Sequence, residues 1–179
     1  MQTVDLERLK NKDLNEFKAL AKEYSSDVFS VAYCILLSPA QAHLVAEKTF
    51  LRAYEQIDAF TEKADLSDWL CKIAYEEAGE YAKRINDPTV RFAGKANEMS
   101  LDSFYYSKNN KVFDIEKDVK LALSILPVDQ REALLLHDGY GFGYDKLSYM
   151  MNVSPGIIRS RTGLARSGIK NILFKKWNV

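Results

Sequence analysis

Apolar residues recur at three- and four-residue steps in the first half of the chain, the spacing of helices with one buried face. Asp13 is a good N-cap for a first helix over 14–37, and Pro39 is expected in the first turn of a second helix over 40–57. A third helix is expected over 67–84, after a loop. The apolar positions that predict the buried faces are Phe17, Leu20, Ala21, Tyr24, Val28, Val31, Ala32 and Ile35 in the first helix, Leu44, Val45, Phe50, Leu51 and Tyr54 in the second, and Trp69, Leu70, Ile73, Ala74 and Tyr81 in the third.

The helical period stops over 85–114, where Pro, Gly, Asn and Ser are mixed with isolated apolar residues. A stretch this long without a period is uncommon inside one compact domain. The 179 residues include only 8 Gly and 4 Pro, and 47% are hydrophobic, which favours packed helices elsewhere. The chain is therefore predicted to be all-α, with two small helical domains over 1–85 and 115–179 joined by a flexible linker over 86–114.

Helical periodicity returns over 115–126 and 128–141. A short helix over 144–151, a brief turn and a longer helix from Ser154 onward then give the pattern of a helix-turn-helix. Ser154 is a good N-cap, and Pro155 falls at the first helical position. In DNA-binding proteins of this type the second helix enters the major groove, so a nucleic-acid function is indicated.

Charge is unevenly distributed along the chain. The sequence holds 25 basic and 25 acidic residues, but no acid follows Asp145. The basic residues after that point are Lys146, Arg159, Arg161, Arg166, Lys170, Lys175 and Lys176, which leaves 18 basic against 25 acidic residues before them. Spare positive charge at one end of a neutral chain favours a polyanionic partner for that end.

A helical wheel separates the last helix into two sides. The apolar side carries Ile158, Leu164, Ala165, Ile169 and Ile172, and the opposite side carries Arg159, Arg166 and Lys170, flanked by Thr162 and Gly163. Arginine binds phosphates or guanine edges, lysine binds phosphates and glycine allows close approach, so this side is predicted to lie in a DNA major groove. Arg161 points toward the apolar side and is expected to pair internally, with Glu132 as the candidate partner. The alternative is a solvated cationic side with no partner.

Several functional classes lack support in the sequence. The N-terminus has no signal-peptide core, and the longest apolar run, over 29–37, is too short for a membrane span, so no membrane insertion and a cytoplasmic location are expected. Cys34 and Cys71 are expected as reduced core thiols, and His43 and His137 have no Cys or His at metal-ligand spacing. With no glycine-rich phosphate loop and no nucleophile elbow, no metal, no cofactor and no catalytic residue are expected, and an enzyme is not favoured.

Two C-terminal motifs, "LPVDQREALLL" and "YDKLSYMMNVSPGIIRSRTGLARSGI", follow one another within residues 126–169. In order and spacing they resemble region 4 of bacterial RNA polymerase sigma factors, most closely the small extracytoplasmic-function (ECF) group. The matching positions are Leu126, Pro127, Gln130, Arg131, Glu132, Tyr144, Gly156, Ile158, Arg159, Ser160, Arg161, Ala165 and Arg166.

The N-terminal half resembles region 2 of the same family. The helix motif "AYCILLSPAQAHLVAEKTFLRAY" matches at Ala32, Tyr33, Ala42, Phe50, Leu51, Arg52 and Ala53, and "WLCKIAYEEAGEYAKR" matches at Trp69, Leu70, Ile73, Ala74, Tyr81 and Arg84. Two helical domains with a loose linker are also the family's plan, which agrees with the organisation expected from periodicity.

The resemblance implies a sigma factor that directs core RNA polymerase to promoters and catalyses no reaction itself. Region 2 would bind the clamp helices of the polymerase β′ subunit through Leu44, Glu47, Lys48, Leu51 and Tyr54. It would hold the melted −10 element through Trp69, Lys72, Tyr75, Glu76, Lys83 and Arg84. Region 4 would sit on the β flap and read the −35 element of the promoter DNA through Ser154, Gly156, Arg159, Ser160, Thr162, Gly163, Arg166 and Lys170. ECF factors are commonly held by an anti-sigma factor, so such a partner is also implied.

The sequence departs from the family pattern at several functional positions in region 2. His43 and Leu44 stand where the clamp-binding helix usually has an acidic pair, and Glu47 stands where it has Gln. Glu76 and Glu80 replace the usual Asn and Asp in the next helix. Carboxylates at these positions would repel DNA phosphates, so the departures weaken the expected contacts.

The recognition helix departs from the pattern as well. Leu164 replaces the usual Arg, Lys146 replaces an acid in the supporting helix, and Gly163 and Gly168 each cost about 1 kcal/mol of helix stability. The alternative function is therefore a degenerate sigma-like DNA-binding regulator or adaptor that needs a partner subunit. A plain helix-turn-helix repressor would leave the region 2 match unexplained, and a protein–protein module would make the basic side dispensable.

Overall fold

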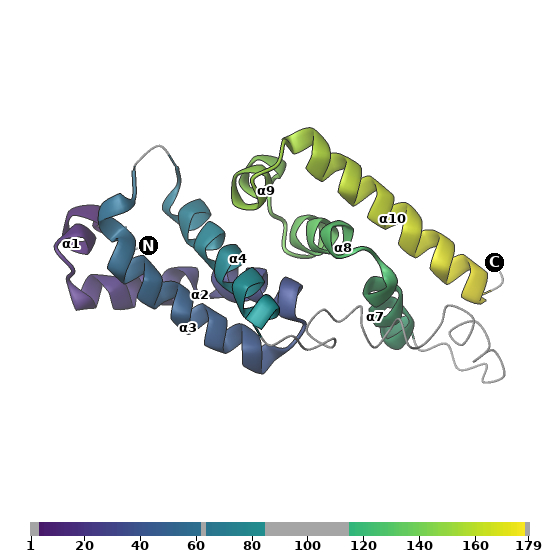
Figure 1. Ribbon diagram of the computed structural model, residues 1–179, viewed down its shortest axis with the longest axis horizontal. Coiled ribbons are helices and arrows are strands. Elements are labelled where there is room, and N and C mark those ends of the chain that lie inside the picture. The colour runs from purple at the N-terminus through teal and green to yellow at the C-terminus, as the bar shows by residue number, and fades with distance from the viewer. Residues whose placement is uncertain (1–3, 62–63, 85–114, 178–179) are drawn as a thin grey trace. The chain divides into compact units, whose positions relative to one another are not determined.

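A computed structural model of the protein describes residues 4–61, 64–84 and 115–177 (Figure 1). These residues form helices and connecting turns with no strand among them, so the predicted all-α class is confirmed. Residues 86–114, the predicted linker, lie outside the described residues. The chain divides into two compact units, one with helices α1 to α4 and the other with α7, α8, η3, the first part of α9 and α10.

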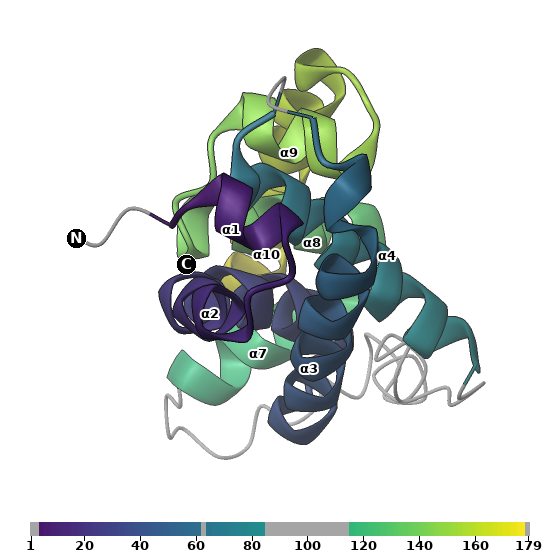
Figure 2. The same ribbon diagram turned by 90° about the vertical axis from the view of Figure 1, so that its left-hand side faces the viewer.

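The first unit is built around α2. Its elements are α1 (Leu6–Lys10), α2 (Leu14–Leu36), α3 (Pro39–Gln56), the 3-10 turn η1 (Ile57–Ala59) and α4 (Leu66–Arg84). Helix α2 packs against both α3 and α4, which also pack against each other, and Figure 2 shows α2 nearly end-on with α3 beside it. Asp13 caps α2 by accepting hydrogen bonds from the N–H groups of Asn15 and Glu16, and Pro39 stands in the first turn of α3 behind the cap Ser38. Both helix starts agree with the sequence prediction.

The core of this unit lies between α2, α3 and α4. Most of the positions predicted to form the buried face of α2 are buried, namely Phe17, Leu20, Val28, Val31, Ala32 and Ile35. Helix α4 contributes Leu70, Ile73 and Ala74 as predicted, and Cys34 and Cys71 are buried thiols in the same core. The helical period is therefore a good guide to the cores of α2 and α4.

The surface of α3 differs from the prediction. Leu44 and Leu51, both expected in the core, are 52% and 64% exposed. The residues that α3 buries are mainly small ones, Ala42, Val45, Ala46, Thr49 and Ala53. Small side chains let helices pack closely, and the two leucines, seven residues apart, lie on the opposite, outward stripe of α3.

The second unit is built around α10. Its elements are α7 (Ile115–Ile125), α8 (Val128–Leu134), the π-helical turn η3 (Leu135–Gly139), α9 (Tyr144–Met151) and α10 (Pro155–Trp177). Helix α10 packs against α7 and α8 around a cluster of Leu126, Leu134 and Ala165. The single helix expected over 128–141 is instead divided, because α8 passes into η3 and the chain turns at Gly141, whose φ of 75° suits glycine.

Gly168 leaves room for the buried side chain of Leu126 beside α10. A Cβ atom added at Gly168 would lie 2.8 Å from Leu126 Cδ2, well inside a normal contact distance. A Cβ atom added at Gly163 would have nothing within 4 Å. The two glycines, equal in their cost to an isolated helix, therefore differ in role: Gly168 makes room for the core and Gly163 lies on open surface.

The far end of α10 is fixed to α7 by one buried acid. The Asp118 carboxylate pairs with the Lys176 ammonium and accepts a hydrogen bond from Trp177 Nε1 at 2.9 Å. Burial raises the pKa of Asp118, but the hydrogen bonds from Lys176 and Trp177 outweigh it, and the pKa lies below its ordinary value. Asp118 is therefore a charged carboxylate at neutral pH.

Candidate nucleic-acid interface

Helix α10 presents an exposed cationic face that begins at its first turn. The Ser154 hydroxyl accepts a hydrogen bond from the Ile157 N–H at 3.4 Å, and Pro155 is the first helical residue, as the sequence predicts. No acidic residue occurs within α10. The predicted DNA-binding residues that lie exposed on this helix or at its start are Ser154, Gly156, Arg159, Ser160, Gly163, Arg166 and Lys170.

Arg166 is held by a carboxylate from outside α10. Its Nε lies 2.8 Å from Asp138 Oδ2 and its Nη2 lies 2.6 Å from Asp138 Oδ1, which makes a bidentate ion pair. The hydrogen bond from Arg166 lowers the pKa of Asp138, and the hydrogen bond to Asp138 raises the pKa of Arg166. Both groups are therefore charged at neutral pH, and two parallel hydrogen bonds fix the orientation of the guanidinium.

Arg159 lies over an aromatic ring from α9. Its guanidinium carbon is 5.1 Å from the centroid of the Tyr144 ring, which in turn lies 4.1 Å from the His137 ring centroid. A cation over a ring face keeps its N–H groups available to other partners. Sequence reasoning missed the roles of Asp138 and Tyr144 because each lies many residues before the arginine that it contacts.

Two residues of α10 lie on different sides of the helix from those predicted. Thr162, proposed as a DNA contact, is fully buried and donates its hydroxyl hydrogen bond to the Ile158 carbonyl at 2.9 Å. Leu164, placed on the apolar side by the wheel, is 56% exposed. The buried side of α10 is centred on Ile158, Thr162 and Ala165, so Thr162 faces the core and Leu164 faces outward.

Arg161 forms the internal ion pair that the sequence predicts, but with a different acid. Its Nε lies 3.0 Å from Asp129 Oδ2, at the start of α8, whereas Glu132 was the expected partner. Asp129 lies one helical turn before Glu132 on α8. The helical wheel therefore placed Arg161 on the correct side of α10 but did not identify which turn of α8 it contacts.

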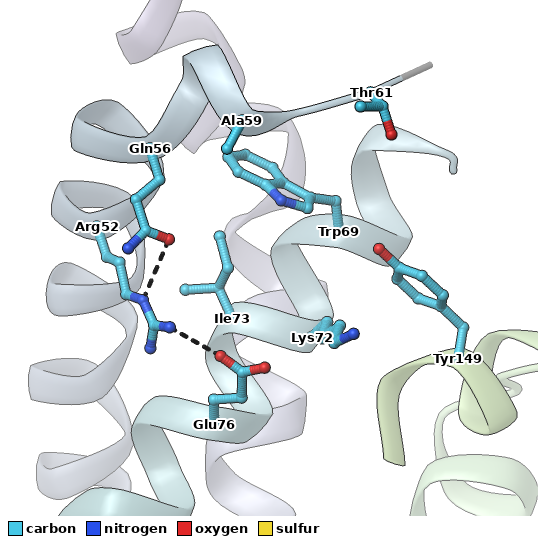
Figure 3. Close-up of a pocket in the computed structure, with 9 residues that line it drawn as sticks. All are labelled: Arg52, Gln56, Ala59, Thr61, Trp69, Lys72, Ile73, Glu76 and Tyr149. Carbon is cyan, nitrogen blue, oxygen red and sulfur yellow. Dashed lines mark hydrogen bonds and ion pairs between the residues drawn. The ribbon is translucent and has the colours of Figure 1, made fainter. Parts of the chain in front are cut away.

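The predicted −10 contacts lie along α4, and three of them line a pocket. Trp69, Lys72 and Tyr75 are half-buried, and Glu76, Lys83 and Arg84 are exposed. Figure 3 shows Trp69, Lys72 and Glu76 of α4 at the pocket, with Arg52 and Gln56 of α3 beside them. Trp69 also packs against Phe60, with ring centroids 5.2 Å apart. The pocket therefore combines an aromatic wall with charged groups of both signs.

Arg52 pairs with two acids of α4. Its Nη2 lies 2.8 Å from Glu76 Oε2, drawn in Figure 3, and its Nη1 lies 3.0 Å from Glu77 Oε1. Further along α4, Arg84 Nη2 lies 3.0 Å from Glu80 Oε2. The carboxylates that the sequence marked as unfavourable for DNA are therefore each paired with a cation.

The predicted polymerase-binding residues share the outward side of α3. Leu44, Glu47, Lys48 and Leu51 are exposed on consecutive turns. Tyr54 continues the row but is half-buried, with its ring 4.8 Å from the Phe17 ring centroid. Two exposed apolar side chains therefore lie between charged ones on the outward side of α3.

Comparison with known proteins identifies the family. Residues 117–167 match the family "Sigma-70, region 4". The chain is also 32% identical over 146 residues to "ECF RNA polymerase sigma factor EcfG" of Rhodopseudomonas palustris (strain TIE-1), across 80% of this chain and 78% of that protein. The chain belongs to the ECF RNA polymerase sigma factors. This sigma factor is also 28% identical over 153 residues to "ECF RNA polymerase sigma factor SigC" of Mycobacterium tuberculosis, across 85% of this chain and 80% of the relative.

Solved structures share the fold of this sigma factor. The sigma factor RpoE in complex with the anti-sigma factor NepR, from Bartonella quintana, aligns with a TM-score of 0.64 and 22% identity, across 88% of this chain and 96% of RpoE. CnrH in complex with the cytosolic domain of CnrY aligns with a TM-score of 0.67 and 16% identity, across 94% of each chain. These likenesses support the all-α architecture.

Among the residues that the structure describes, no group of three His, Cys, Asp or Glu side chains could hold a metal ion. No helix within the same ranges is both long and apolar enough to cross a membrane.

Proposed function

We propose that this sigma factor binds core RNA polymerase through its first unit and reads promoter DNA through both units. The observation that carries the proposal is the exposed cationic face of α10, in the part of the chain that matches region 4. Residues 1–85 act as region 2, residues 115–179 act as region 4, and residues 86–114 connect the two. The second unit also sits on the β flap of the polymerase.

Helix α10 reads the −35 element in the major groove. Arg159 and Arg166 bind guanine edges or phosphates, and Lys170 binds a phosphate. The small exposed residues of the same face, which allow close approach and add hydrogen bonds, are Ser154, Gly156, Ser160 and Gly163. Thr162 takes no part, because its hydroxyl is buried against the Ile158 carbonyl.

Helix α4 and its pocket hold the melted −10 element. The residues proposed for this role are Trp69, Lys72, Tyr75, Glu76, Lys83 and Arg84. Trp69 offers an aromatic wall for a flipped base, and exposed Lys83 and Arg84 offer charge to the backbone. Pairing with Arg52 reduces the repulsion between Glu76 and the DNA phosphates.

The outward side of α3 binds the clamp helices of the β′ subunit. Leu44 and Leu51 supply the apolar contacts, Glu47 and Lys48 supply the polar ones, and Tyr54 extends the row. Exposed leucines rimmed by charged residues are typical of a protein–protein contact surface.

Binding rather than catalysis is the proposed activity, since the polymerase makes the RNA and the sigma factor supplies promoter choice. It needs no cofactor and acts in the cytoplasm with the polymerase. An anti-sigma factor is a further proposed partner, since the solved RpoE relative is in complex with the anti-sigma factor NepR.

Reconstitution tests the proposal. The full chain is mixed with bacterial core RNA polymerase, run on size exclusion and assayed for transcripts on fragmented genomic DNA from the source organism. We expect co-elution and discrete promoter-specific transcripts. The Leu44→Ser/Leu51→Ser variant, altered only at exposed positions, should fold but fail to co-elute. If the wild type binds DNA but does not co-elute, the degenerate regulator that needs a partner subunit is favoured instead.

A further inference from the structure

The carboxylate that holds Arg166 comes from η3, outside the helix proposed to enter the groove. We infer that Asp138 is a specificity-determining residue, which fixes Arg166 so that the remaining edge of its guanidinium reads one guanine of the −35 element. The inference rests on the proposed function of α10 as the −35 reader. Asp138 acts through Arg166 and is therefore a positioning residue that need not touch DNA.

The ion pair with Asp138 uses one edge of the Arg166 guanidinium. Asp138 accepts from Nε and Nη2, which form one edge of the planar guanidinium. A guanidinium has a second edge, formed by Nη1 and Nη2, whose two parallel N–H donors match the O6 and N7 acceptors of guanine. The Arg166 side chain is 53% exposed and also has a hydrogen bond with Tyr144 among its interactions. In the proposed complex, the donors that Asp138 does not hold turn to the base.

Asp138 lies in a π-helical turn that is closed by backbone hydrogen bonds. The Tyr140 N–H donates to the Leu135 carbonyl at 3.1 Å, and the Phe142 N–H donates to the Leu136 carbonyl at 2.9 Å. Both hydrogen bonds link residues before Asp138 to residues after it. The His137 ring Nδ1 lies 2.7 Å from the Phe142 carbonyl oxygen. A carboxylate held in this way can fix the direction of a long, flexible arginine, which otherwise samples many rotamers.

Asp138 is expected to have two opposing effects on DNA binding. One acts on every duplex and the other on a single base, so measurements on different duplexes distinguish them. Its negative charge weakens attraction to phosphates on every duplex, irrespective of sequence. Its hold on Arg166 strengthens the contact with one base only. Removal of Asp138 should therefore leave non-specific binding equal or tighter while the preference for guanine at one position falls.

The probe is a duplex obtained by selection. The full chain, assembled with core polymerase, is used to select −35 sequences from a promoter library randomised over the −35 region. Each guanine of the selected duplex is then replaced by adenine in turn, and the ratio of the two affinities is measured. Arg166→Ala identifies the guanine whose ratio depends on Arg166.

The variants Asp138→Ala, Asp138→Asn and Asp138→Glu are then compared at that guanine. We expect about a tenfold fall in the affinity ratio for Asp138→Ala and Asp138→Asn, and partial recovery for Asp138→Glu, which keeps a carboxylate. In an Arg166→Ala background the change at Asp138 should have no further effect on the ratio. Asp145→Asn, an exposed acid of the same unit, is the matched control for loss of one charge and should leave the ratio unchanged.

Thermal melts show which variants are folded, and Asp138→Asn carries the test if Asp138→Ala is unstable. Equal tightening on all duplexes with an unchanged ratio would overturn the inference, because Asp138 would then only compete with phosphates. A preference that needs Arg166 but not Asp138, or that survives Arg166→Ala, would overturn the inference and leave the proposed function standing. Selection that enriches no −35 sequence would overturn both.

Discussion

Helices α4 and α10, the two helices proposed to meet DNA, use their cations differently. Around α4, Arg52 binds Glu76 and Glu77 and Arg84 binds Glu80, so positive charge is spent on acids of the same unit. On α10, Arg161, Arg166 and Lys176 also pair with acids of their own unit, but these acids come from other elements, because α10 carries none. Arg159 lies over the Tyr144 ring. The placement of acids along a helix, rather than the number of cations, therefore decides whether the helix presents an exposed cationic face.

The largest expected effect is a loss of DNA affinity when the cations of α10 are removed. The double change Arg159→Ala/Arg166→Ala should lower affinity for the selected −35 duplex about 100-fold, because two guanidinium contacts are lost. The measurement is a titration of the duplex by polarisation at fixed salt. Lys175→Ala, an exposed cation on the same helix, is the control and should change affinity only slightly. Equal losses in both variants would mean that α10 acts through bulk charge alone.

The next effect is a difference in stability between substitutions on the packed face and on the open face of α10. Gly168→Ala should destabilise the second unit by about 1–2 kcal/mol, because the added methyl group displaces buried Leu126 and outweighs the gain in helix propensity. Gly163→Ala adds the same methyl group into open space and should stabilise the unit by up to about 1 kcal/mol. Urea unfolding of the two variants measures both. Stabilisation by Gly168→Ala would show that Leu126 can move aside freely.

A smaller effect tests whether the cations paired with the acids of α4 stabilise the first unit. Arg52→Ala should lower the free energy of unfolding by about 1 kcal/mol, since it removes the bridge from α3 to both Glu76 and Glu77. Arg84→Ala removes an exposed pair within one helix and should cost less than about 0.5 kcal/mol. Chemical denaturation of each variant is the measurement. Equal costs would mean that Arg52 does not tie the two helices together.

The smallest effect is a dependence on pH at the end of α10. The pKa of Asp118 is lowered on folding, so its contribution to stability is complete above the ordinary pKa and is lost as pH falls toward the lowered one. The stability difference between wild type and Asp118→Asn should therefore shrink as the pH is lowered through that window. Urea unfolding followed by Trp177 fluorescence in a Trp69→Phe background measures it. A constant difference would mean that the Asp118 charge contributes nothing.

Much of the fold follows from the sequence because periodicity and capping are local properties. The starts of α2, α3 and α10 were predicted from Asp13, Pro39 and Ser154. The exposure of Leu44 and Leu51 was not, because leucines seven residues apart fit a buried face and a binding face equally well.

The candidate interface was predicted less completely. A helical wheel orders the side chains of α10 but does not show which angle faces the core, so Thr162 was taken for a DNA contact although it is buried. The Asp138–Arg166 pair joins residues 28 positions apart across a π-helical turn, and no local pattern indicates a contact of that kind.

The anchoring of Trp177 and Lys176 to Asp118 also has a mechanical consequence. A helix of 23 residues at 1.5 Å per residue extends about 35 Å, several turns more than a groove contact requires. The last turn of α10 is fastened to α7, and the basic residues of the proposed DNA-reading face lie before that turn on the same helix. A rotation of α7 would therefore move the whole of α10. It would change the angle at which the proposed DNA-reading face meets the major groove.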